Sequence, residues 1–239
     1  MNGIWRWIGW LLPLGFVAAH VATMMALNDP WQNWFISEYG PKEMLSAGMF
    51  GACALLTARL LSRRWRVIPT RFRGLLVVFA LGSAFVAVEE ISYGQTFWDY
   101  QSPEWFKTHN AQDEFNLHNL AGDKPSRLLR RVGEIGMPLF GLMLPLVWMR
   151  RKGGYEVGTV GFHLFPRFEL LGAVAGSFAI RVIWWWRKTL EQMPSWTAGM
   201  SELQELIWAF AGVVWIVEIK RRVESQASRV EAGAEAGAI

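Results

Sequence analysis

Residues 75–92 read LLVVFALGSAFVAVEEIS, and this stretch decides the fold class. Its first fourteen residues carry no charge, and two adjacent glutamates, Glu89 and Glu90, follow them. A helix that crosses a bilayer needs about 20 mostly apolar residues. The stretch therefore predicts a transmembrane helix with two carboxylates at one end. Because ionisable groups inside a membrane are costly and usually functional, these glutamates are also the first candidate site residues.

The composition of the whole chain agrees with a membrane protein. Of the 239 residues, 52% are apolar and only 18% are charged, whereas a soluble domain carries about 25% charged residues. The net charge is +4 and the one cysteine is Cys53. This composition excludes a disordered chain and a disulfide-bonded scaffold.

Six apolar segments predict six membrane spans. They cover residues 5–27, 44–61, 75–92, 132–149, 168–186 and 203–219. We expect an all-α polytopic helix bundle that forms a single domain over residues 1–222, followed by a flexible cytoplasmic tail over residues 223–239. The fourth span contains Pro138 and Pro145 and is predicted to be a kinked helix, since neighbouring groups in a membrane protein satisfy the carbonyls that proline leaves free. The fifth span contains Arg181.

The basic residues predict the orientation. With the N-terminus inside, fifteen lysines and arginines fall on the inner side and eight on the outer side. The positive-inside rule then predicts that both termini are cytoplasmic. The basic loop 63–73 joins two spans, so it is typical of an orientation signal and of contact with anionic lipids. We therefore expect the bilayer as a partner and no nucleic acid.

Several titratable residues are predicted to lie at the same depth, in the outer leaflet. They are His20, Glu89, Glu90, Glu134, Arg181 and Glu205. A shared polar pocket is the simplest interpretation. On a helical wheel Glu90 lies beside a face of small residues, which lets helices approach, while Glu89 points away. We therefore predict a buried role for Glu90, an interfacial role for Glu89, and Arg181 as a cation that neutralises the pair.

The long outer loop, residues 93–131, holds a second concentration of polar residues. If residues 108–121 form an amphipathic helix on the outer surface, Asn110, Glu114 and His118 lie on one face of it. Folded back over the bundle, this helix would bring Glu114 and His118 to the two glutamates. Carboxylates with an imidazole suit Zn, Mn or Fe as a divalent metal cofactor, or act as an acid–base pair.

The predicted catalytic residues are thus Glu90, Glu114 and His118, and these are also the candidate metal ligands. The predicted supporting or substrate-binding residues are Glu89, Gln95, Asn110, Gln112, Asn116, Asn119 and Arg181. Other interpretations stay open. The paired glutamates could form a structural ion pair with Arg181 or with Arg127, Arg130 and Arg131. Glu114 and His118 could belong to a solvated helix face. His20, within a run of alanines, is either a pigment ligand or a packing residue.

Two motifs carry a resemblance to a known family. Residues 89–95 read EEISYGQ and residues 110–119 read NAQDEFNLHN. This resembles the signature EEISxGQ … NxQxExNLHN of an uncharacterised family of bacterial multi-span inner-membrane proteins, with Tyr93 where tryptophan is commoner. The resemblance covers residues 89–119. It implies a location in a bacterial inner membrane and a site at these residues, and it implies no particular reaction.

Three classes of function fit these observations. The first is a membrane enzyme, a hydrolase or transferase that acts on a lipid headgroup at the outer leaflet. The second is a non-catalytic scaffold or accessory subunit of a larger membrane complex, and the third is a small transporter. Transport is least favoured, because the polar residues gather in one leaflet and no inverted repeat is visible. The enzyme is favoured slightly, because Asn, Gln, Glu and His occur together at one depth.

Overall fold

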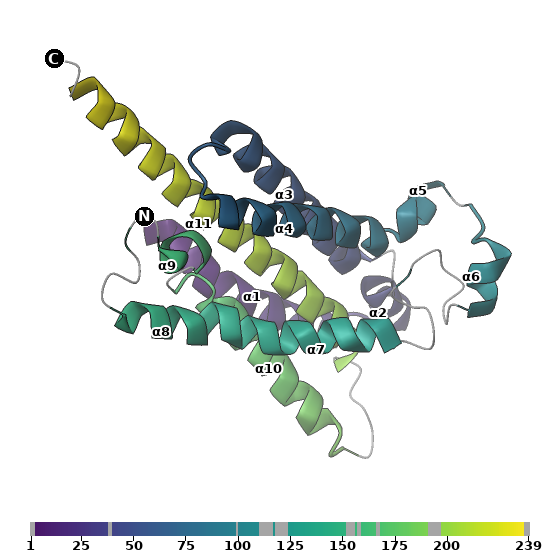
Figure 1. Ribbon diagram of the computed structural model, residues 1–239. Helices are drawn as coiled ribbons and strands as arrows, with labels where there is room; N and C mark the ends of the chain where they lie inside the picture. Colours follow the sequence, from purple (N-terminus) through teal and green to yellow (C-terminus); the bar gives the residue numbers. More distant parts are fainter. Residues whose placement is uncertain are drawn as a thin grey trace.

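Helices make up all the regular secondary structure in the part of the chain that the computed structural model describes, which covers residues 3–37, 40–98, 100–109, 117, 124–151, 156, 159–165, 168–190 and 197–236. The elements (Figure 1) are α1 (Gly3–Ala26), α2 (Asp29–Ile36), α3 (Pro41–Arg64), α4 (Thr70–Glu90), η1 (Ser92–Gly94), α5 (Gln95–Trp98), α6 (Glu104–His109), α7 (Lys124–Pro138), η2 (Leu139–Met143), α8 (Leu144–Arg150), α9 (Val160–Leu164), α10 (Leu171–Arg187) and α11 (Met200–Ala236). The predicted all-α class is confirmed.

Within the described ranges, five helical stretches are long and apolar enough to cross a membrane. They are Trp7–Ala26, Pro41–Arg64, Thr70–Glu90, Arg130–Arg150 and Met200–Arg229. Their faces are largely uncovered, since between 11% and 50% of the residues in each apolar window are buried within the chain. The protein is therefore a multi-pass membrane protein. The remaining predicted span corresponds to α10, which has 17 residues and lies at the short end of the range for a spanning helix.

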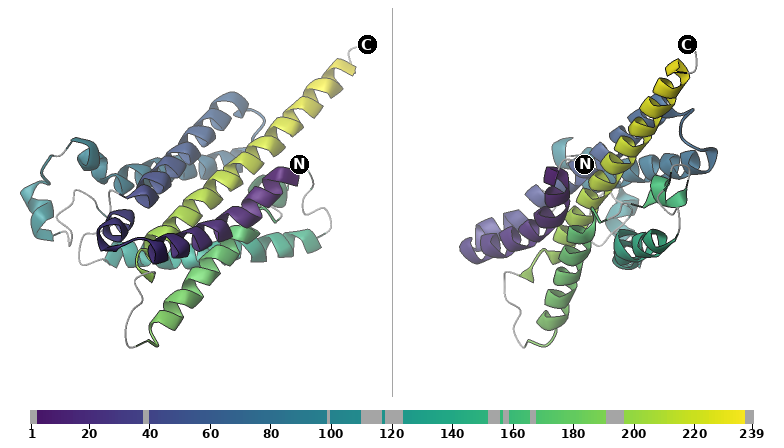
Figure 2. Two further views of the ribbon diagram at one scale, coloured as in Figure 1. Left: turned by 180° about the vertical axis from the view of Figure 1, so that it is seen from behind. Right: turned by 90° about the vertical axis from the view of Figure 1, so that its left-hand side faces the viewer.

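Helix α11 runs through the centre of the bundle (Figures 1 and 2) and joins its two cores. On one side it packs with α3 and α4 through Leu60, Leu76 and Ile216. On the other it packs with α1 and α10 through Ile180 and Ile207. Groups carried by α11 are consequently held between helices from both halves of the chain.

Residues 223–236 of the predicted flexible tail are helical. Helix α11 continues without interruption to Ala236, and Val223 and Ala227 are buried along it. Its 37 residues correspond to about 55 Å, longer than the ~30 Å apolar core of a bilayer. Figure 1 shows the C-terminal part of the helix projecting beyond the other helices. The packing of Val223 against α3 and α4 explains why the helix passes the boundary predicted at residue 222.

The two prolines of the predicted fourth span do not end it. Helices α7 and α8 are joined by η2, a π-helical segment, into one continuous rod. Pro145 has no N–H to donate to the carbonyl of Gly141, four residues earlier. Within η2 the N–H of Leu144 donates instead to the carbonyl of Leu139, five residues earlier. This wider turn accommodates the proline without breaking the span.

Helices α1 and α10 approach so closely that no side chain fits between them. A Cβ on Gly172 would lie 2.2 Å from the carbonyl oxygen of Trp10 and 2.4 Å from that of Gly9. The indole N–H of Trp10 donates to the carbonyl of Phe168 at 2.7 Å, next to this crossing. Backbone contact of this kind requires glycine and is common between membrane helices.

The described part of the loop after η1 contains two short helices, α5 and α6. The predicted helix over residues 108–121 overlaps the end of α6, which stops at His109, and Leu117 is a bend. A bend at Leu117 interrupts a continuous helix there. The other residues of the predicted helix, 110–116 and 118–121, lie outside the described part of the chain.

Candidate functional site

Glu89 and Glu90 end α4 and point to different partners. The backbone N–H of Leu117 donates to Oε2 of Glu89 at 2.8 Å, while the hydroxyl of Ser46 on α3 donates to Oε2 of Glu90. Glu89 is 4% exposed, and Glu90 is only partly buried. The predicted assignment of the buried role to Glu90 is therefore wrong. A helical wheel places side chains around one helix, and it takes no account of the loop that returns over Glu89.

A tight turn makes that return possible. Ser92 and Tyr93 have φ values of 45° and 54°, and Gly94 has 93°, all in the left-handed region. A Cβ on Gly94 would lie 2.3 Å from the ring of Trp98, so only glycine fits there. The hydroxyl of Tyr100 donates to the carbonyls of Ser92 and Tyr93 at 3.3 and 3.1 Å. Three successive left-handed residues reverse the chain directly after the glutamates.

Tyr93 completes the surroundings of Glu89. Burial, a hydrogen bond with the Glu89 carboxylate and the negative charge of that carboxylate together raise the pKa of the Tyr93 phenol to about 12. The phenol is therefore a donor to the carboxylate at neutral pH. Gln95, a predicted supporting residue, lies at the start of α5, and its Oε1 accepts from the hydroxyl of Ser102 at 3.3 Å.

Helices α3 and α11 bring further charges to this end of the bundle. Glu43 lies within electrostatic range of Glu90, Glu205 and Lys42. Lys42 is 4% exposed, and its ammonium group donates to the carbonyl of Gly199 at 2.9 Å and lies 4.0 Å from the Glu202 carboxylate. The group thus combines side chains from the start of α3, the end of α4 and the start of α11.

A cavity of about 610 Å³ opens from this group of charges. We call it the carboxylate cavity. Its polar lining is Glu89, Glu90, Glu205 and Arg130, which together form its carboxylate end. Its apolar lining includes Phe50, Leu75, Phe79, Phe85, Val86, Val132, Met137, Phe140, Leu164, Leu170, Trp208, Ala211 and Trp215, with Gly133, Gly136, Gly141 and Gly212.

Two donors on the cavity wall have no hydrogen-bond acceptor within the described residues. They are the Nε of Arg130 and the indole Nε1 of Trp208, and both atoms are buried. The ring of Trp208 lies directly on Gly133, where an added Cβ would come within 2.5 Å of it. Buried donors are nearly always paired in folded proteins, so two unpaired donors beside one cavity are an unusual feature of this site.

Arg181 does not neutralise the paired glutamates. Its guanidinium donates to Oε1 of Glu134 on α7 at 2.7 Å and lies over the ring of Trp184. The Arg181 side chain is 55% exposed. The positive charge at the cavity comes instead from Arg130, which is one of the arginines considered in the alternative ion-pair interpretation. Sequence position alone places both arginines near the same depth and does not tell which side of the bundle each one faces.

The other predicted site residues are not tested by the geometry. Glu114, His118, Asn110, Gln112, Asn116 and Asn119 all lie outside the described part of the chain. Within the described ranges, no group of three or more His, Cys, Asp or Glu side chains is close enough to hold a metal ion. The predicted Zn, Mn or Fe site depends on Glu114 and His118 and stays a prediction.

Sequence reasoning missed several residues of this site. Three of them lie in the first turns of α3, within one turn of residue 44, where the second span was predicted to begin: Lys42, Glu43 and Ser46. Their closeness to the end of the span was a usable signal. Arg130 was named only as an ion-pair partner in the alternative interpretation and not as a site residue. Trp208 could not be found from sequence, because its relation to the cavity depends on the close contact with Gly133 on another helix.

The two described histidines within the bundle pack against aromatic rings. His20 is 2% exposed, with its ring 5.9 Å from that of Phe35. His163 is 3% exposed, with its ring 4.8 Å from that of Phe72. Burial, together with the positive charges of the nearby Arg71 and Arg222, lowers the pKa of His163 to about 4. His163 is therefore neutral at physiological pH and belongs to the packing around α9.

Comparisons with protein-family models, with curated proteins and with solved structures found no match to this chain. The resemblance carried by residues 89–119 stays a prediction.

Proposed function

We propose that the chain is a membrane enzyme, a hydrolase or transferase that binds a lipid in the carboxylate cavity and acts on its headgroup. One observation carries this proposal: a single cavity is polar at one end and apolar along the rest of its length. A lipid has the same division between headgroup and chain. The apolar lining favours burial of a hydrocarbon chain by about 25 cal/mol per Å².

The dimensions of the cavity support a lipid chain. Leu75 and Glu90 both line it, and they are fifteen residues apart on α4, which corresponds to about 22 Å along the helix axis. One leaflet of the apolar core is about 15 Å thick. The cavity is therefore long enough for one acyl chain. Its volume of about 610 Å³ lies within the ~300–1,000 Å³ of small-molecule sites.

The polar end supports recognition of a headgroup. The Arg130 guanidinium, which lines the cavity and is partly exposed, supplies N–H donors for phosphate or ester oxygens. The carboxylates of Glu89, Glu90 and Glu205 accept from hydroxyl or ammonium groups. A headgroup that carries both a phosphate and a hydroxyl or amine satisfies both sets.

The same carboxylates support acid–base chemistry. In hydrolysis or transfer, a carboxylate takes a proton from the attacking water or hydroxyl, and a protonated group gives one to the leaving oxygen. Glu90 is the proposed base, because it is partly accessible and is oriented by Ser46. Glu114 and His118 stay the predicted partners for proton transfer or for a divalent metal. Metal content measured after purification without chelator separates these two versions.

Lipid binding is tested with two matched glycine substitutions. Gly136 lines the cavity and has open space at its Cβ position, so Gly136→Leu puts a side chain into the cavity without a backbone clash. Gly82 on α4 also has open space, is exposed, and does not line the cavity. Lipid retained by the purified protein is counted by native mass spectrometry. We expect one lipid on the wild type and on Gly82→Leu, and loss of it in Gly136→Leu. Equal retention by all three proteins contradicts the proposal.

Catalysis is tested separately with two glutamates. Glu90→Gln is expected to lower headgroup release from a lipid mixture by about 100-fold or more, as loss of a general base does. Glu134→Gln is the control, because Glu134 is a carboxylate at similar depth that pairs with Arg181 and does not line the cavity. If both folded variants keep full activity, Glu90 is not the base. If Glu90→Gln instead loses a stoichiometric partner protein, the scaffold interpretation replaces the enzyme.

A further inference from the structure

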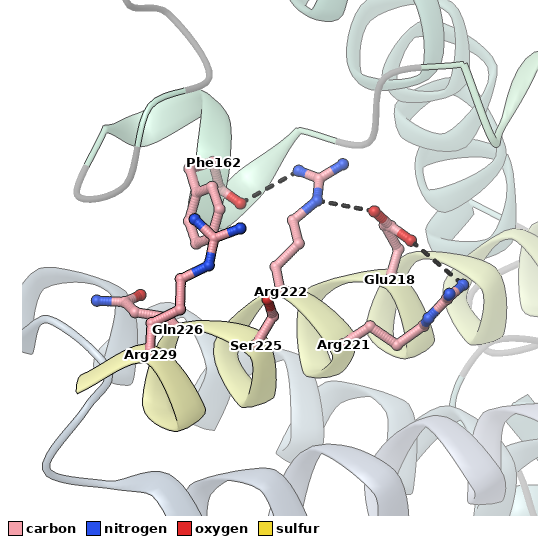
Figure 3. A pocket seen from close by; sticks show the side chains of 7 residues that line it. All are labelled: Phe162, Glu218, Arg221, Arg222, Ser225, Gln226 and Arg229. Carbon is pink, nitrogen blue, oxygen red and sulfur yellow. Dashed lines mark hydrogen bonds and ion pairs between the residues drawn. The ribbon is translucent and has the colours of Figure 1, made fainter. Parts of the chain in front are cut away.

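A second pocket lies at the other end of the bundle, where α9 meets α11 (Figure 3). Its volume is about 280 Å³, and its lining is Phe162, Glu218, Arg221, Arg222, Ser225, Gln226 and Arg229. Arg222, Ser225, Gln226 and Arg229 are spaced i, i+3, i+4 and i+7, which places them on one face of α11. We call this the arginine pocket. It shares no residue with the carboxylate cavity.

Arg222 builds the pocket. Its Nε donates to Oε1 of Glu218 at 2.8 Å, and its NH1 donates to the carbonyls of Gly161, Phe162 and Phe165 at 3.4, 3.1 and 2.8 Å. All three carbonyls lie in or directly after the short helix α9, where the last carbonyls of a helix lack a full set of partners within it, and that of Gly161 also accepts from the N–H of Phe165. Arg222 therefore ties α9 to α11, which fixes Phe162 over the face that carries Arg229.

The pocket carries an excess of positive charge. Three guanidinium groups line it, against the one carboxylate of Glu218. Both oxygens of that carboxylate are already engaged, by Arg222 at 2.8 Å and by Arg221 at 4.0 Å. Arg229 has no ion-pair partner in the described part of the chain. Figure 3 shows Arg222 and Arg229 rising from α11 toward Phe162.

The depth of the pocket points to the membrane surface. Arg151 lies over the ring of Trp148, and Arg73 lies over the ring of Trp65, both at this end of the bundle. Tryptophans paired with arginines are typical of the interface between the bilayer and water. Basic pockets between helices at this depth bind the headgroups of anionic lipids.

We infer that the arginine pocket binds the phosphate of an anionic phospholipid from the leaflet at this end of the bundle. Arg221 and Arg229 contact the phosphate, and Arg222 positions the site by holding α9. Guanidinium groups suit phosphate because they donate two parallel N–H bonds. The inference is independent of the proposed enzyme, since it concerns another pocket at the opposite end of the bundle.

The test compares two double variants of the full chain in detergent. Arg221→Gln/Arg229→Gln removes both phosphate contacts and leaves Arg222 in place. Arg63→Gln/Arg66→Gln removes the same charge from exposed positions at the same end of the bundle and outside the pocket. The probes are phosphatidylglycerol, phosphatidylcholine and inorganic phosphate, and binding is titrated by native mass spectrometry.

We expect the wild type to bind phosphatidylglycerol more tightly than phosphatidylcholine. The pocket variant should lose about tenfold in affinity for phosphatidylglycerol, the effect of about 1.4 kcal/mol in charge-assisted contacts, and the control variant should lose less than about twofold. An equal loss in both variants overturns the pocket, since it indicates diffuse charge attraction. Equal affinity for the two lipids overturns the anionic specificity. Inorganic phosphate that binds as tightly as the lipid overturns the lipid as the source.

Discussion

Replacing Gly172 with alanine is expected to drive α1 and α10 apart. The new Cβ would lie 2.2 Å from the Trp10 carbonyl oxygen, whereas ordinary contact begins at 3.4 Å. The atoms in the way belong to the backbone of α1, so they cannot move aside as a flexible side chain does. The helix has to retreat by about 1.2 Å, and overpacking of this kind costs about 1–3 kcal/mol.

Gly82→Ala isolates this cost. Alanine is a better helix former than glycine by about 1 kcal/mol, and both variants gain this term, but the Cβ at Gly82 meets nothing within 4 Å. Thermal unfolding in detergent, followed by circular dichroism, should give Gly172→Ala a midpoint several degrees below that of Gly82→Ala. Coincident midpoints for the two variants would refute the close crossing of α1 and α10.

Two further perturbations test the cavity wall and the packing of α9. Gly133→Ala places a Cβ 2.5 Å from the ring of Trp208, so the indole has to move, and we expect lipid retention by the carboxylate cavity to fall while Gly82→Ala keeps it. Below pH 6.5 the unfolded chain binds a proton on His163 that the folded chain, with a pKa of about 4, does not bind. Stability should therefore fall as the pH drops from about 6.5 to 4, and His163→Phe should flatten that part of the pH profile; an unchanged slope would mean that other groups cause it.

The membrane class was predictable because it depends on composition and on the length of apolar runs, and not on which residues contact each other. The uncharged run before Glu89 needs only its length to indicate a span, and α4 ends at Glu90, within two residues of the predicted end. The convergence of three carboxylates was predictable for the same reason. Glu89, Glu90 and Glu205 were assigned to one leaflet from their distance to the span ends, and all three line one cavity.

Partners were not predictable, because they depend on which helices are neighbours. Arg181 and Arg130 have similar depth, but α10 places Arg181 beside Glu134 while α7 places Arg130 at the cavity. The reversed burial of Glu89 and Glu90 has a similar origin. Three left-handed residues after α4 bring the chain back over Glu89. Two of them, Ser92 and Tyr93, are not glycine, and such residues seldom adopt a positive φ, so the turn was not expected from the sequence.

The most direct test of the central claim is a photocrosslinking map. The probe is a phospholipid with a diazirine at the end of one acyl chain, and the labelled residues are read by mass spectrometry. If the chain enters the carboxylate cavity, label should appear on its deep lining, at Phe79, Leu164 and Trp215, and Gly136→Leu should remove it. Label confined to the outward faces, at Val78, Leu81 and Phe178, would contradict a lipid site inside the bundle.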